Sequence, residues 1–171
     1  MRGFLVAMPG GDWGTRATVA HMARLARQAA PAPIVRTTAA RLVFGLTPAE
    51  ADAQCREIGE WVGQHTMFLP DPSGVEALHD PAWLVREALT RGVVQCDCDD
   101  VAMLAAAMGL SVGLRARFVV VGFHSPNSPY QHVWTELAGP RPGASWWSID
   151  PTRPAQGLGA LPISRALTVE V

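Results

Sequence analysis

The chain has 171 residues, of which 49% are apolar and 17% are charged, a composition typical of one globular domain. Its formal net charge of -1 lacks the basic excess that a nucleic-acid-binding surface requires, so we expect no nucleic-acid partner. The longest run without a charged residue or a histidine, 101–114, is shorter than the roughly 20 residues needed to cross a bilayer, so we expect no membrane span.

The three cysteines, Cys55, Cys96 and Cys98, are odd in number and lack the spacing of a disulfide framework. The short apolar start is interrupted by Pro9-Gly10-Gly11 and cannot form the core of a signal peptide. We therefore expect no signal peptide, a reducing compartment such as the cytoplasm, and thiols that are free to react.

The first two thirds of the chain are predicted to be mainly helical. Residues 1–14 are rich in glycine and are expected to be irregular. Apolar residues at helical spacing then predict five helices, over 15–29, 34–44, 47–62, 82–90 and 98–108. Between the third and fourth helices, 66–72 is expected to be a short strand or an extended link, and 71–74 is expected to form a turn.

Caps mark several of these helix ends. Thr47 is a predicted N-cap with Glu50 completing a capping box, and Asp80 precedes a proline at the start of the fourth helix. Gly92 and Gly109 are predicted to end the last two helices. The residues of the fourth helix predicted to face inward are Leu84, Val85, Ala88 and Leu89.

After residue 109 the periodicity changes from helical to strand-like. Strands are predicted over 114–123, 130–137 and 146–150, separated by loops that contain proline and glycine. The second strand alternates, with His132, Trp134 and Glu136 on one face. Helices followed by strands predict an α+β domain in which the Cys98 helix packs on a C-terminal antiparallel sheet.

Three residues on these elements have the order of a thiol-based catalytic triad. Cys98 lies at the start of an apolar helix, His132 lies on a strand, and Asp150 ends the next strand. A cysteine nucleophile, a histidine base and a carboxylate that orients the base would serve acyl transfer. The catalytic residues predicted from the sequence are therefore Cys98, His132 and Asp150.

The surroundings of Cys98 have opposing effects on its ionisation. The helix N-terminus and a protonated His132 would favour the thiolate, whereas the neighbouring acidic residues, Asp97, Asp99 and Asp100, would oppose it. The Cys98 backbone N–H and, more weakly, the Gln95 side chain are candidates for stabilising the oxyanion. Trp134 is a candidate for lining the substrate groove, although core packing would also explain an aromatic residue there.

These residues resemble the transglutaminase-like superfamily, and most closely its small bacterial and phage branch. The motifs that carry the resemblance are Cys98-Asp99-Asp100, His132-Val133-Trp134, Trp146 through Asp150-Pro151-Thr152, Asp71 through Glu76, and Pro81 through Leu84. The resemblance implies a papain-like fold over a core at 35–152, with 1–34 as an N-terminal extension and 153–171 as a C-terminal tail of one domain. Cys96 stands where the family usually has glycine, two residues before the nucleophile.

Other interpretations of the same residues remain open. Cys96 and Cys98 could bind zinc with His132 or His124, although the two cysteines are closer together than in usual zinc sites. The acidic residues beside Cys98 could attract a divalent cation, but they lack the pattern of a calcium loop. Cys55 is expected to be a core residue. We expect no metal and no cofactor.

Three functions are compatible with this sequence. The first is a cysteine hydrolase of amide bonds that forms a thioester with a peptide or protein substrate, cell-wall peptides included. The second is a transamidating enzyme in which an amine replaces water. The third is a catalytically silent assembly module associated with a phage virion, whose partners would be other virion proteins.

Overall fold

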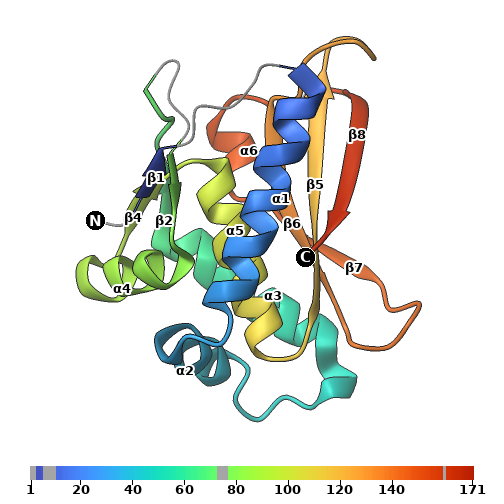
Figure 1. Ribbon diagram of the computed structural model, residues 1–171. Helices are drawn as coiled ribbons and strands as arrows, with labels where there is room; N and C mark the ends of the chain where they lie inside the picture. Colours follow the sequence, from blue (N-terminus) through green and yellow to red (C-terminus); the bar gives the residue numbers. More distant parts are fainter. Residues whose placement is uncertain (1–2, 6–10, 73–76, 160) are drawn as a thin grey trace.

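The computed structural model describes residues 3–5, 11–72, 77–159 and 161–171, and it has the α+β architecture expected from the sequence. Helices surround the central helix α5, and an antiparallel sheet closes one side of the molecule (Figure 1). In chain order the elements are β1 (Gly3–Leu5), α1 (Gly11–Ala29), α2 (Pro33–Leu42), the 3-10 turn η1 (Pro48–Glu50), α3 (Ala51–His65), β2 (Thr66–Phe68), β3 (Ala77–His79), α4 (Pro81–Arg91), β4 (Val94–Cys96), α5 (Cys98–Ser111), β5 (Arg115–Phe123), β6 (His132–Ala138), β7 (Trp146–Ile149), α6 (Thr152–Ala155) and β8 (Ile163–Glu170).

Helix α5 is the centre of the hydrophobic core. All of its residues from Asp99 to Gly109 are buried, and it packs against α1, α2, α3, α4 and β6. Such a helix needs apolar or small side chains on every face, which the run of alanines and methionines supplies. The core therefore fixes the position of its first residue, Cys98.

The prediction that Gly109 ends this helix is wrong. The helix continues to Ser111, and a Cβ at Gly109 would lie 2.5 Å from a methyl carbon of Leu137 on β6. The glycine therefore permits close contact between helix and sheet. Gly113, with a φ of 86°, lies in the turn that follows the helix.

The main sheet has four antiparallel strands in the order β7-β6-β5-β8. Its first three strands match the predicted ones. The segment assigned to a C-terminal tail supplies the fourth, since β8 pairs with β5 through partners such as Phe118 and Val169. The side chains of β8 are exposed or only partly buried, so its sequence has no apolar run of the kind that marks a buried strand.

The helix caps largely agree with the sequence. Thr47 and Glu50 form the capping box, with the Thr47 backbone N–H donating to Glu50 Oε2 at 3.0 Å, and the Asp80 side chain accepts from the backbone of residue 82. Helix α1 starts at residue 11, so 11–14 are helical and not irregular as predicted. Leu89 was predicted to face inward, but it is 55% exposed.

The structure also has two pairs of short strands, of which only β2 lies in a segment predicted to be a short strand or an extended link. β1 pairs with β3, and β2 runs parallel to β4 with Phe68 opposite Cys96. Strands of three residues have too little periodicity to be recognised in a sequence. The second pair leads directly into α5 and so fixes the entry of the chain to Cys98. The predicted turn at 71–74 lies partly outside the described residues.

Within the described ranges, no helix is both long enough and apolar enough to span a bilayer.

Candidate active site

Cys98 is the first residue of α5, and its neighbours form a regular helix start. Asp97 is the N-cap, and its carboxylate accepts a hydrogen bond from the backbone N–H of Asp100 at 3.3 Å. This bond satisfies one of the free donors of the first turn. The sequence thus places a thiol at the helix N-terminus, as predicted.

The Cys98 thiol is held in its protonated form. Its sulfur donates to Asp99 Oδ1 at 3.6 Å. Burial raises the pKa of the Cys98 thiol well above its ordinary value, and the charges of Asp99 and Asp97 raise it further, whereas a hydrogen bond from the Val133 backbone lowers it. The acidic neighbours therefore act on the pKa in the direction expected from the sequence, and burial adds a larger effect in the same direction.

The structure brings His132 and Asp150 into direct contact. His132 begins β6 and its side chain is fully buried; its Nε2 lies 2.9 and 3.0 Å from the two carboxylate oxygens of Asp150. Asp150 follows β7 and also accepts from the Arg153 backbone N–H at 3.1 Å and from the Thr152 hydroxyl at 3.4 Å. A carboxylate held in this way fixes the orientation and tautomer of the ring.

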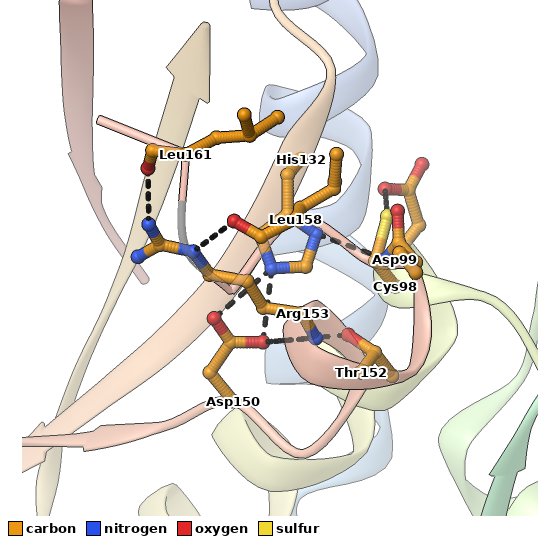
Figure 2. Close-up of polar contacts among 9 residues, drawn as sticks. Cys98, Asp99, His132, Asp150, Thr152, Arg153, Leu158 and Leu161 are labelled. Atoms are coloured by element: carbon orange, nitrogen blue, oxygen red, sulfur yellow. Dashed lines mark hydrogen bonds and ion pairs between the residues drawn. The ribbon is translucent and has the colours of Figure 1, made fainter. Parts of the chain in front are cut away.

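Cys98 and His132 line the same cavity, which has a volume of about 390 Å³. Its walls are the start of α5, the segment 129–133 that leads into β6, and the N-terminal half of α1. In Figure 2 the Nε2 edge of the ring faces Asp150, while its other nitrogen points toward the side on which Cys98 lies.

The sulfur and the imidazole are not joined by a hydrogen bond among the described residues. The sulfur donates to Asp99, and Nδ1 of His132 lies 3.1 Å from the amide nitrogen of Gln156. Hydrogen bonds between catalytic groups are often long or absent without substrate and form only in the reacting complex. The three predicted residues therefore gather at one site, with the contact between nucleophile and base still to be made.

The structure does not bring Gln95 or Trp134 to the cavity wall. Gln95 is exposed on β4 and is not among the described residues that line the cavity, so its position does not support an oxyanion role. Trp134 is buried in a small cluster with Val119, Val121 and Phe123, and its ring centroid lies 6.0 Å from that of His132. Two residues along the strand from His132, it packs behind the base and not beside the thiol.

Two contributions to the site were missed from the sequence. Helix α1 supplies a cavity wall built from small residues such as Gly14, Thr15 and Thr18, although it lies in the segment treated as an extension. Gln156 contacts the imidazole from a segment without helical or strand periodicity. Neither carries a motif, so only the tertiary structure could reveal them.

The zinc alternative has no ligand set in the described part of the chain, where no three His, Cys, Asp or Glu side chains are grouped to hold a metal ion. Cys96 is buried and its sulfur lies 3.9 Å from the carbonyl oxygen of Val94. Burial raises the pKa of the Cys96 thiol, and the charge of Asp100 raises it further. Cys55 is buried on α3, as expected, and burial raises the pKa of its thiol to about 11.

A second histidine–aspartate pair lies on another side of the α5 N-terminus. Asp100 is 1% exposed and accepts from the backbone N–H of His79 at 2.8 Å and from the ring Nδ1 at 2.6 Å. The His79 ring stacks on Trp83 with a centroid distance of 5.1 Å. Neither His79 nor Asp100 is among the residues that line the Cys98 cavity.

Comparison with known families fits this geometry. The family model of the transglutaminase-like superfamily matches residues 36–151. The chain belongs to the transglutaminase-like superfamily. This confirms the resemblance seen in the sequence and places the chain among papain-like cysteine enzymes in general. The matched segment contains Cys98, His132 and Asp150, and it leaves out α1, Gln156 and β8.

One solved structure with the same fold is a protein of Parabacteroides distasonis that is provisionally named a protease. The TM-score is 0.56 at 16% sequence identity, over 90% of this chain. The chain spans only 29% of that protein's length, and identity this low supports the shared fold alone. No curated protein matches the chain.

Proposed function

We propose that this transglutaminase-like chain is a cysteine-dependent hydrolase that cleaves amide bonds in a peptide or protein through a thioester. The observation that carries the proposal is that His132, held by Asp150, lines the same cavity as Cys98. A base oriented by a carboxylate beside a thiol at a helix start is the arrangement that acyl transfer requires.

In the first half of the reaction, Cys98 Sγ attacks the carbonyl carbon of the amide. Because the thiol is protonated at rest, its proton passes to Nδ1 of His132 as the carbon–sulfur bond forms. The Cys98 backbone N–H, in the first turn of α5, is the candidate donor to the oxyanion. The carbon–nitrogen bond then breaks, and the imidazolium returns the proton to the leaving amine.

In the second half, His132 removes a proton from water as the water attacks the thioester. The carbon–sulfur bond breaks, the carboxylic acid leaves, and the proton returns to Cys98. If an amine takes the place of water, the same acyl-enzyme gives transamidation. The choice between the two depends on which acceptor reaches the cavity.

A catalytically silent assembly role is the second candidate. It is favoured by the raised pKa of the Cys98 thiol and by the Cys98 sulfur, which donates a hydrogen bond to Asp99 and not to the imidazole. The cavity that reaches Cys98 argues against it, because a silent module needs no such space. In the first case the partner is a peptide substrate, with cell-wall peptides as one class; in the second, the partners are other virion proteins.

The experiment incubates the purified chain with a panel of linear and cross-linked peptides, with and without added amine, and identifies products by mass spectrometry. We expect cleavage, and a covalent acyl adduct that maps to Cys98. Cys98→Ala should abolish both, whereas Cys55→Ala, which removes a thiol outside the cavity, should retain them. Amide products that form only with added amine would replace hydrolysis by transamidation.

Alkylation of Cys98 by chloroacetamide gives a readout that needs no substrate. Labelling that is absent from a folded Cys98→Ala variant, but is kept in Cys55→Ala, supports a reachable nucleophile at Cys98. A Cys98 that resists labelling from pH 6 to 9 in the folded chain, with no peptide cleaved, would contradict the hydrolase and favour the silent module.

A further inference from the structure

One short segment contacts both nitrogens of the His132 ring. The Asp150 carboxylate contacts Nε2, and six residues later the side-chain amide nitrogen of Gln156 lies 3.1 Å from Nδ1. The chain returns to the ring because 152–155 form one helical turn, after which the Gln156 backbone N–H donates to the carbonyl of Thr152 at 3.0 Å.

The segment is fixed by Arg153. Its Nε donates to the carbonyl of Leu158 at 3.3 Å and its Nη2 to the carbonyl of Leu161 at 2.8 Å (Figure 2). The guanidinium also lies 5.4 Å from the centre of the Phe123 ring. Gln156 is therefore carried by a turn that is anchored on either side of it.

These contacts select one tautomer of the neutral ring. A neutral imidazole has one N–H donor and one lone pair. Asp150 is an acceptor and takes the N–H at Nε2, which leaves the lone pair at Nδ1 to accept from the Gln156 amide. The only nitrogen that could receive the thiol proton is therefore already occupied, and the Cys98 sulfur donates to Asp99 instead.

We propose that Gln156 is a positioning residue that holds His132 in the Nε2–H tautomer and competes with the Cys98 thiol for Nδ1, so that attack requires this contact to open. The inference rests on the proposed function, in which His132 is the base. It explains why a site with an oriented histidine shows no sulfur–imidazole hydrogen bond. Binding of substrate that displaces the Gln156 amide would then couple recognition to activation of the thiol.

The test compares Gln156→Met, which keeps the side-chain length but cannot donate, with the wild-type chain. Alkylation of Cys98 by chloroacetamide is followed from pH 6 to 9 with peptide mapping. We expect Gln156→Met to raise the labelling rate at pH 7 by about threefold to tenfold, as expected for the release of one hydrogen bond. Gln28→Met, at an exposed position on α1, is the matched control and should leave the rate unchanged.

Nitrogen-15 NMR of the His132 ring reads the tautomer directly. The wild-type chain should show a proton on Nε2 and none on Nδ1 at pH 7, and Gln156→Glu, which can only accept, should favour a proton on both nitrogens. A wild-type proton on Nδ1, or a folded Gln156→Met variant whose labelling rate is unchanged or lower, would overturn the inference.

Neither readout depends on turnover, so the inference can fail separately from the proposed function. The Nε2–H signature should persist in Cys98→Ala, which has no nucleophile. If this signature and the faster labelling of Gln156→Met are both found but no peptide is cleaved, the Gln156 contact stands and the hydrolase proposal falls.

Discussion

The two histidine–aspartate pairs of this protein have similar chemistry and different surroundings. His132 of the first pair lines the cavity that Cys98 also lines, whereas neither His79 nor Asp100 lines that cavity and their contact joins β3 to the start of α5. In the first pair, Nδ1 of His132 lies on the side of the ring away from Asp150 and contacts Gln156. In the second pair, Asp100 accepts from the His79 ring and also from the His79 backbone N–H. The comparison teaches that a His–Asp contact becomes a candidate for catalysis only when the second ring nitrogen faces a reactive group across a cavity.

The largest expected effect separates the pairs by activity. Asp150→Asn removes the charge that fixes the His132 tautomer, so we expect the kcat/KM of peptide cleavage to fall by about 10³-fold or more. Asp100→Asn should reduce it far less, since that carboxylate does not touch the base. Initial rates of peptide cleavage give kcat/KM for both variants. Equal losses of kcat/KM would contradict the assignment of different roles to the two pairs.

The second prediction separates the pairs by stability. Asp100→Ala leaves two partly buried donors of His79 without their acceptor, and we expect it to lower the free energy of unfolding by about 3 kcal/mol. Asp150→Ala should cost less, because its carboxylate is more exposed, at 16% against 1%. Urea denaturation followed by circular dichroism gives both free energies of unfolding. A larger loss of unfolding free energy in Asp150→Ala than in Asp100→Ala would contradict the prediction.

The third prediction concerns the thiol beside the first pair. Burial and the charges of Asp99 and Asp97 raise the pKa of Cys98, so alkylation of the folded chain at pH 7.5 should be more than about tenfold slower than that of the unfolded chain. Asp99→Asn should speed it, since the largest charge effect is removed. A folded thiol that reacts as fast as the unfolded one would show an ion pair with His132 already formed.

The smallest expected effect is a pH dependence of stability from the second pair. The hydrogen bond that the His79 ring donates to Asp100 raises the pKa of His79 above its ordinary value of 6.5; burial opposes this effect, and the charges of Asp100, Asp71 and Asp97 add to it. Because the folded state holds the proton more tightly, this stabilisation is complete below pH 6.5 and is lost as the pH rises through the raised value.

We therefore expect the free energy of unfolding to fall by about 1 kcal/mol across that interval of pH. His79→Gln should remove this decrease in the free energy of unfolding with pH, while His65→Gln, on α3, should leave the decrease unchanged. A wild-type profile that rises with pH over the same interval would contradict the assignment.

Much of the helical part of the fold could be predicted because its signals are local. The capping box at Thr47 and Glu50, the cap at Asp80 and the apolar run after Cys98 each act within one turn of helix. Gly109 misled the prediction, since its role depends on Leu137, a residue far away in sequence. The strand β8 was not predicted, because its extended conformation depends mainly on its pairing with β5.

For the candidate site, residue types and their order on helix and strands indicated Cys98, His132 and Asp150, and the structure gathers all three. Gln95 was assigned from its proximity in sequence to the thiol, but the direction of β4 turns it to solvent. Gln156 and α1 could not have been found, because their approach to the site depends on how the segment after Asp150 and the first helix pack.

By itself, the sequence determined the candidate residues for the chemistry and the elements that present them, since side-chain type, periodicity and capping act over a few residues. Tertiary packing decided which group contacts Nδ1 of His132 and how far the Cys98 thiol is buried. Those properties depend on distances between segments far apart in the chain and on burial from water, neither of which is encoded at any one position.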